Sequence, residues 1–136
     1  MSNKEQTLSI IKPDAVERNL DNEIKEMFKN KGFVILKEKK IQIEKFEAEK
    51  FYKVHETKPF YSDLCAYLSS GPIVVMVLEN ENAVIANRKL MGATNPNDAD
   101  EGTIRKKYGI SIDKNSVHGS DSVENAKNEI DFFFKG

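Results

Sequence analysis

Residues 73–78, Ile-Val-Val-Met-Val-Leu, form the most apolar run of the chain and constrain its fold more than any other segment. The run has six residues and is rich in β-branched side chains, which favours a strand over a helix. A continuous apolar strand is typical of a buried position in a sheet. Gly71 and Pro72, directly before the run, indicate a turn. We therefore predict that residues 73–78 form a buried central strand.

Strand and helix patterns alternate along the rest of the chain. Short β-prone runs predict strands at residues 7–11, 33–43 and 116–118. Apolar residues at helical spacing predict helices at residues 21–31, 45–55 and 61–69. Asn80 is predicted to cap a fourth helix that Gly92 ends. A last helix is predicted from a capping-box pair, Asp121 and Glu124, with Val123, Ala126 and Ile130 on its apolar face.

The order of these elements, β-α-β-(α-α)-β-α-β-α, resembles the split βαβ, or ferredoxin-like, arrangement. We therefore predict an α+β fold, βαββαβ, in which helices cover one face of a four-stranded antiparallel sheet. A length of 136 residues suits a single domain, here residues 1–136, and no repeat, low-complexity tract or linker divides the chain. The polar residues 93–114 predict a long loop, which in a compact domain is usually functional or disordered.

Composition and charge exclude several classes of function. With 21 Lys and Arg against 22 Asp and Glu, the net charge of −1 gives no general argument for binding nucleic acid or an anionic membrane. Cys65 is the only cysteine, so neither an intrachain disulfide nor a thiolate metal cluster can form. No apolar run approaches the roughly 18 residues of a membrane span, and the N-terminus lacks the apolar segment of a signal peptide. We therefore predict a cytoplasmic protein.

The segment with the most chemical content is residues 115–122, Asn-Ser-Val-His-Gly-Ser-Asp-Ser. His118, one of only two histidines, precedes a small hydroxyl-rich turn at a predicted helix start. Backbone N–H groups at such a start attract anions, phosphate above all. A neutral imidazole beside an anion site suits a phosphoryl acceptor, because histidine forms covalent intermediates. By itself, His118 is equally consistent with a hydrogen-bonded structural histidine.

Three basic residues, Lys12, Arg88 and Arg105, lie near predicted strand, loop or helix ends, where binding sites gather. Each one alone is more often a solvated surface charge, and only their combination with His118 favours a phosphate site. The sequence has no P-loop, no dinucleotide-binding glycine motif and no protein-kinase motif. Any phosphate site must therefore be built without these common motifs.

Several motifs together resemble one family. Residues 115–122 resemble the active-site signature of nucleoside diphosphate kinases. Other motifs match in that family's order, and the resemblance runs from about residue 7 to residue 134. These motifs are Leu-Ser-Ile-Ile-Lys-Pro-Asp-Ala-Val at 8–16, Phe-Tyr-x-x-His at 51–55, Lys-Pro-Phe at 58–60, Ser-Gly-Pro at 70–72, Arg-Lys-Leu-Met-Gly-Ala-Thr-Asn-Pro at 88–96 and Gly-Thr-Ile-Arg at 102–105. The resemblance implies the ferredoxin-like fold and transfer of the γ-phosphate of a nucleoside triphosphate, mainly ATP, to a nucleoside diphosphate. It also implies a ping-pong reaction through a phosphohistidine, with Mg²⁺ as cofactor.

The resemblance, rather than spacing, implies the roles of the individual residues. His118 is the expected nucleophile and Glu129 is expected to hold its other ring nitrogen, so activity should fall as the ring gains a proton. The resemblance places five residues at the phosphates: Lys12, His55, Arg88, Thr94 and Arg105. Tyr52 is expected near the transferred phosphate, and Lys12 and Asn115 at the ribose. Phe60 is expected to stack on the base between Leu64 and Ile112, and Gly119 and Ser120 to complete the pocket of the histidine. No dedicated protein ligand set is expected for Mg²⁺, which phosphate oxygens and water would mainly hold.

Family members assemble as homo-oligomers, and the sequence leaves tetramer and hexamer open. The chain ends soon after Phe134, as in bacterial members, and Glu101 stands where many relatives have proline. Two other classes of function also remain. A phosphocarrier would pass a phosphate from His118 to another protein, but the set of nucleotide contacts argues against that as the main role. A ferredoxin-like sheet sometimes binds nucleic acid, but the net charge argues against it here.

Overall fold

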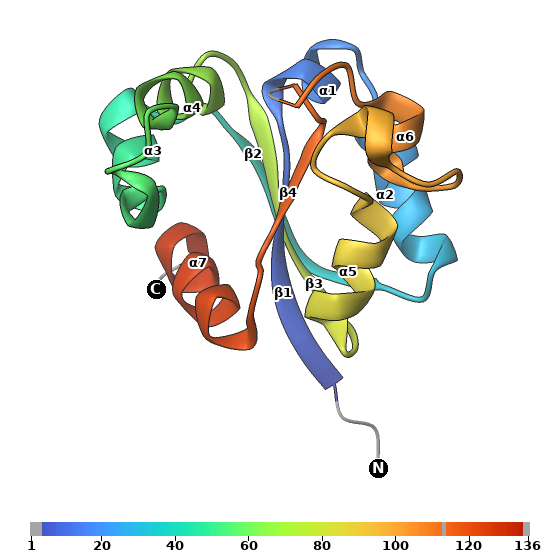
Figure 1. Ribbon diagram of the computed structural model, residues 1–136. Coiled ribbons are helices and arrows are strands. Elements are labelled where there is room, and N and C mark those ends of the chain that lie inside the picture. Colours follow the sequence, from blue (N-terminus) through green and yellow to red (C-terminus); the bar gives the residue numbers. More distant parts are fainter. Residues whose placement is uncertain (1–3, 113, 135–136) are drawn as a thin grey trace.

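A four-stranded sheet forms the centre of the molecule (Figure 1). The computed structural model describes residues 4–112 and 114–134. The strands are β1 (Lys4–Ile11), β2 (Val34–Ile41), β3 (Ile73–Glu81) and β4 (Val117–Gly119). Their order is β2-β3-β1-β4, and every neighbouring pair is antiparallel. The predicted βαββαβ sheet, with its apolar run in a central strand, is confirmed.

Helices cover both faces of the sheet, so the prediction of a single covered face is wrong (Figure 1). One face carries α1 (Pro13–Glu17), α2 (Asp21–Asn30), α5 (Ala83–Met91) and α6 (Ile104–Tyr108). The other carries α3 (Lys45–Phe51), α4 (Tyr61–Leu68) and α7 (Val123–Phe134). Two short 3-10 turns lie at Lys53–His55 and Pro96–Asp98. None of the helices in the described ranges is long and apolar enough to cross a membrane.

The two-sided cover explains why the apolar run of β3 has no polar interruptions. Val74, Met76 and Leu78 pack into the core beneath α2 and α5, with Phe28 of α2 among their neighbours. Ile73 and Val75 point to the opposite core, beneath α3 and α4. Successive side chains of a strand alternate between faces, so both sets must be apolar when both faces are buried.

Two predicted N-cap residues are wrong: neither Asn80 nor Asp121 caps the helix that follows it. Asn80 lies within β3, paired with Glu5, and α5 begins after Asn82, whose side chain makes no capping hydrogen bond. At α7 the capping oxygen is Ser122 Oγ, which accepts from Asn125 N at 3.1 Å, in place of Asp121. Val123, predicted on the apolar face of α7, is 47% exposed.

The first helix after β1 was not predicted, because Pro13 indicated only the end of a strand. Proline also suits the first position of a helix, where its missing N–H needs no partner, and it takes that position in α1. The helix predicted at residues 45–55 is shorter in the structure: α3 ends at Phe51, and a separate 3-10 turn follows at Lys53–His55. Gly92 ends α5 as predicted, with a φ of 85°.

Candidate active site

A cavity of about 570 Å³ lies beside the end of β4, between the helices of the two faces. It brings together residues that are distant in sequence, from the end of β1, the 3-10 turn at Lys53–His55, α4, α5, α6, β4 and the loops between them. All predicted site residues except Ser120 and Glu129 line it: Lys12, Tyr52, His55, Phe60, Leu64, Arg88, Thr94, Arg105, Ile112, Asn115, His118 and Gly119. Met91 and Asp121 also line the cavity. Neither residue was predicted for the site, although Met91 belongs to the motif at residues 88–96 and Asp121 to the motif at residues 115–122.

His118 is held through one ring nitrogen. It lies on β4, paired with Ile10, and its Nε2 is 3.2 Å from Glu129 Oε1. Ser120 Oγ donates to the same carboxylate oxygen at 2.8 Å. Within the described residues no hydrogen bond reaches Nδ1. A carboxylate that accepts a hydrogen bond from Nε2–H favours the tautomer with the lone pair on Nδ1, the nitrogen from which a nucleophilic attack can start.

The contact between Glu129 and His118 follows from the turn that joins β4 to α7. Ser120 N donates to Leu8 O at 3.2 Å, and Leu8 N donates to Ser120 Oγ at 3.3 Å. These bonds fix the end of β4 against β1, and α7 starts at Val123 directly afterwards. The helix then runs back over the sheet, which places Glu129 beside the imidazole, and spacing alone does not reveal this contact.

Arg105 supplies a buried positive charge to the cavity. It is 8% exposed, and its Nη1 and Nη2 donate to the carbonyl oxygens of Gly92 (3.0 Å) and Val117 (2.8 Å). Its Nε is buried without a hydrogen-bond partner among the described residues. Burial, followed by the nearby charge of Arg88, lowers the pKa of Arg105 to about 10. A site that holds two cations at this cost favours a bound anion.

Tyr52 presents a second donor without a partner. Its hydroxyl is buried and has no hydrogen-bond partner in the described part of the chain. Burial, with a smaller contribution from Glu129, raises the pKa of Tyr52 well above its ordinary value. The phenol therefore stays protonated and can donate to an oxygen atom of a ligand. Buried donors without partners are rare, and two of them in one cavity indicate a place for phosphate oxygens.

Lys12, Asn115 and Thr94 form a polar edge of the cavity. Lys12 Nζ donates to Asn115 Oδ1 at 2.9 Å, although the two residues are 103 positions apart. Asn115 Nδ2 donates to Thr94 O at 3.1 Å, which orients the amide. Lys12 is only 6% exposed and Asn115 only 2%, so both side chains have few alternative positions. This edge offers donors and acceptors suited to the hydroxyl groups of a sugar.

The cavity mouth is apolar. Phe60 is 48% exposed and Ile112 is 55% exposed, and Leu64 is half-buried beside them. Exposed large apolar residues that cluster at a cavity are typical of a ligand-binding surface. A flat apolar group such as a nucleobase would cover them, and an aromatic ring such as Phe60 stacks on any base.

Arg88→Gln should stabilise the ligand-free protein, because Arg88 is exposed and raises the cost of the buried charge on Arg105. We expect the free energy of unfolding to rise by a few tenths of a kcal/mol and by no more than about 1 kcal/mol, since solvent screens an exposed charge. Urea denaturation at low and high salt measures the change, which should shrink at high salt. Lys89→Gln, which removes the same charge from the adjacent residue outside the cavity, is the control. An equal gain in both variants would contradict the repulsion between Arg88 and Arg105.

Comparisons with known proteins find one family by sequence and by structure. A family model described as "Nucleoside diphosphate kinase" matches residues 5–136. The nucleoside diphosphate kinase of Rhizorhabdus wittichii is 58% identical over 131 residues, which cover 96% of this chain and 94% of that protein. The one from Bartonella tribocorum is 56% identical over 130 residues, covering 96% and 93%. Among solved structures, Aquifex aeolicus nucleoside diphosphate kinase has a TM-score of 0.96 and 39% sequence identity, covering 98% of this chain and 96% of its own.

Proposed function

The chain belongs to the nucleoside diphosphate kinase family, and from this premise we propose that it transfers the γ-phosphate of a nucleoside triphosphate, mainly ATP, to a nucleoside diphosphate. The reaction is ping-pong, passes through a phosphohistidine on His118 and maintains nucleoside triphosphate pools. The observation that carries this proposal is the imidazole of His118. Its Nε2 meets Glu129 at 3.2 Å, and the ring lines a cavity that also contains the buried guanidinium of Arg105.

In the proposed first half-reaction, the lone pair of His118 Nδ1 attacks the γ-phosphorus. The bond between that phosphorus and the bridging oxygen breaks, and the nucleoside diphosphate leaves with the electron pair. In the second half-reaction, a terminal oxygen of another diphosphate attacks the same phosphorus, and the N–P electrons return to Nδ1. The Nε2 proton stays hydrogen-bonded to Glu129, whose carboxylate balances the positive charge that develops on the ring.

The nucleotide would lie across the cavity from its apolar mouth to His118. Phe60 stacks on the base, flanked by Leu64 and Ile112, and Lys12 and Asn115 bind the ribose hydroxyls. The phosphates meet a group of donors and cations, which includes Lys12, Tyr52, His55, Arg88, Thr94 and Arg105. Stacking discriminates little between bases, so we expect broad base specificity.

Gly119 and Ser120 complete the proposed histidine pocket in different ways. A Cβ atom at Gly119 would run into the side chains of Asn87 and Met91, so glycine lets β4 lie close to α5. Ser120 bridges Leu8 and Glu129, and thereby couples the carboxylate to the sheet. Both residues would therefore act on the position of the imidazole rather than on the nucleotide itself.

Mg²⁺ fits the donor set of the cavity as an ion that the substrate brings. In the described ranges, no three residues among His, Cys, Asp and Glu gather in a metal-binding cluster. Mg²⁺ commonly retains several waters and binds phosphate oxygens with few protein ligands. Asp121 is the carboxylate on the cavity wall that would accept hydrogen bonds from such waters. When bound, the ion would neutralise phosphate charge.

We also propose that the protein is cytoplasmic and forms one domain over residues 1–136. It would assemble as a homo-oligomer, either a tetramer or a hexamer. The edge strand β2 supports an interface between subunits. It exposes Val34 (49%) and Leu36 (43%) beside unpaired backbone groups, a surface that isolated chains seldom leave open. Light scattering coupled to size-exclusion chromatography measures the subunit number directly.

The proposed function is tested with ATP and a second nucleoside diphosphate, in the presence of Mg²⁺. The expected result is formation of the second triphosphate with parallel double-reciprocal plots, as a ping-pong reaction requires. Protein phosphorylated by ATP and then freed of nucleotide should pass its phosphate to added diphosphate. Phosphorylation without discharge to any nucleoside diphosphate would instead support a phosphocarrier.

Phe60→Ala should raise KM for both nucleotides about tenfold and leave kcat within about threefold, because stacking on an aromatic ring contributes about 1–3 kcal/mol per base. Steady-state kinetics with the two substrates varied independently measure the effect. Phe46→Ala is a matched control, since Phe46 is also exposed (57%) but lies in α3 and does not line the cavity. Equal changes in the two variants would argue against a stacking role for Phe60.

A further inference from the structure

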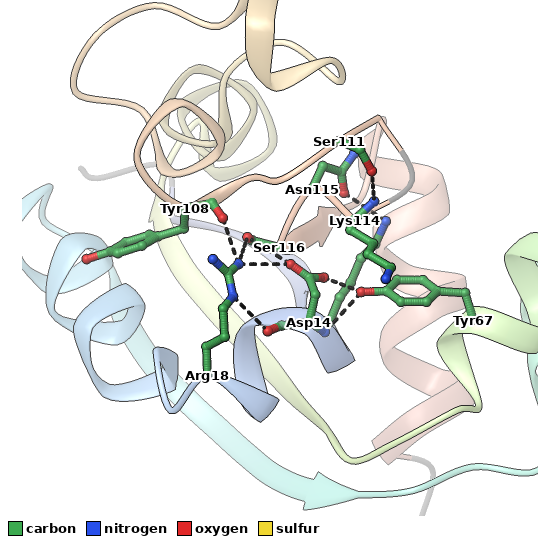
Figure 2. A network of polar contacts seen from close by, with 9 residues as sticks. Asp14, Arg18, Tyr67, Tyr108, Ser111, Lys114, Asn115 and Ser116 are labelled. Carbon is green, nitrogen blue, oxygen red and sulfur yellow. Dashed lines mark hydrogen bonds and ion pairs between the residues drawn. The ribbon is translucent and has the colours of Figure 1, made fainter.

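A buried carboxylate behind the cavity connects segments that carry cavity residues (Figure 2). The side chain of Asp14 is 4% exposed and does not line the cavity. One of its oxygens, Oδ1, accepts a hydrogen bond from the hydroxyl group of Tyr67. The other, Oδ2, accepts from Ser116 Oγ and from Arg18 Nη2, each at 3.2 Å. Asp14 therefore has a separate role from the residues that would touch the nucleotide.

Asp14 is bonded to Arg18 at the end of its own helix and to two distant residues, Ser116 before β4 and Tyr67 on α4. Arg18 Nη2 also donates to Tyr108 O at 2.7 Å, at the end of the helix that carries Arg105. Ser116 follows Asn115, and its carbonyl oxygen accepts from Lys12 N at 2.8 Å. Ser116 is fully buried and has a φ of 75°, a conformation that a residue other than glycine adopts when its surroundings hold it.

Tyr67 connects Asp14 to the helix that follows Phe60. It lies on α4, the helix that begins after Phe60 and contains Leu64. Its hydroxyl donates to Asp14 Oδ1 and accepts from Asp14 N at 2.9 Å, so two hydrogen bonds join α4 to the start of α1. Burial, and then the adjacent Asp14, raise the pKa of Tyr67 above its ordinary value, so the phenol remains a donor.

We propose that Asp14 and Tyr67 are positioning residues that set the distance between a base wall, Phe60 and Leu64, and a phosphate wall, Lys12 and Arg105. A nucleotide that spans the cavity must contact both walls at once, so its binding depends on their separation. A phosphoryl donor without base or sugar needs only the phosphate wall and His118. The inference rests on the proposed roles of Phe60 and His118.

The test uses Tyr67→Phe, which removes one oxygen atom and keeps the ring. We expect KM for both nucleotides to rise about tenfold, as for loss of a hydrogen bond to a charged group, and kcat to stay within about twofold. Phosphorylation of the protein by phosphoramidate, a small donor without base or sugar, should proceed at the wild-type rate. A merely structural defect would slow phosphorylation by both donors.

Tyr61→Phe is the matched control. Tyr61 is on the same helix, and its hydroxyl donates to Glu49 O at 2.7 Å, which joins α4 to α3 on the same side of the cavity. Loss of the Tyr61 hydroxyl group should leave KM for both nucleotides within about twofold of the wild-type value. If Tyr67→Phe folds too poorly to assay, Asp14→Asn weakens the same connection, and KM should then rise about threefold.

Two results would overturn the inference: an unchanged KM in Tyr67→Phe, or equal losses with phosphoramidate and ATP. Failure of the proposed function has a different signature. In that case the wild-type protein itself would accept no phosphate from ATP and pass none to a nucleoside diphosphate, before any substitution at Tyr67.

Discussion

Replacing His118 with alanine should lower phosphoryl transfer between nucleotides by at least about four orders of magnitude. Loss of a covalent nucleophile removes the route through the intermediate, and changes of this size follow its removal in other enzymes that use one. The remaining cavity, with Arg105, Lys12 and Phe60, should still bind nucleotide. We therefore expect ATP to raise the Tm of His118→Ala nearly as much as that of the wild-type protein.

The measurement combines the coupled assay with labelling by ATP that carries radioactive phosphorus at the γ-position. The chain has only two histidines, so His55→Ala is the natural control. It should keep a phosphate label that acid removes and alkali does not, whereas His118→Ala should take up none. Full activity or normal labelling of His118→Ala would reject His118 as the phosphoryl acceptor.

Gly92→Ala should lower the free energy of unfolding by about 2–4 kcal/mol, or roughly 8–15 °C in Tm. Gly92 has a φ of 85° and a ψ of −177°, a region that is essentially restricted to glycine. A Cβ atom there would also lie 2.6 Å from Thr103 Oγ1 and 2.8 Å from Thr103 Cβ. The same glycine accepts a hydrogen bond from Arg105 Nη1, so displacement of its carbonyl should weaken nucleotide binding as well.

Thermal and urea denaturation measure the loss, and Gly102→Ala separates its two causes. Gly102 has a φ of 86°, nearly the same as that of Gly92, but no atom lies within 4 Å of its Cβ position. Gly102→Ala should therefore show the backbone strain alone, about 1–2 kcal/mol. Equal losses in the two variants would contradict a contribution from contact with Thr103.

Features of the fold that depend on neighbouring residues could be predicted from the sequence better than features that depend on distant residues. The apolar run at residues 73–78 predicted a central strand, because an unbroken apolar pattern reports burial directly. The ends of elements were less well predicted. Asn80 has the side chain of a helix cap, but its pairing with Glu5 keeps it in β3, and that pairing depends on the register of β1. A weak local preference is easily overridden by a strand ladder.

The candidate site shows the same difference. The residue types and motifs indicated which side chains to examine, including Lys12, Arg105 and His118. Spacing did not indicate that Glu129 meets His118, a contact that was expected only from the family resemblance, and nothing in the sequence indicated that Asp14 joins Tyr67 to Ser116. These contacts bring together residues as far as 102 positions apart, and they form only after the strands have paired and the helices have packed.

By itself, the sequence determined the order of the strands, the buried central strand and, through motifs that resemble one family, the residues of the candidate site. Periodicity and motif chemistry depend on neighbouring residues, so they can be seen in the chain directly. Only the tertiary structure decided that helices cover both faces of the sheet, that Nε2 is the ring nitrogen of His118 that meets Glu129, and that Tyr67 of α4 contacts Asp14 of α1. Each of these depends on strand register and on the direction in which a helix returns over the sheet, which no short stretch of sequence specifies.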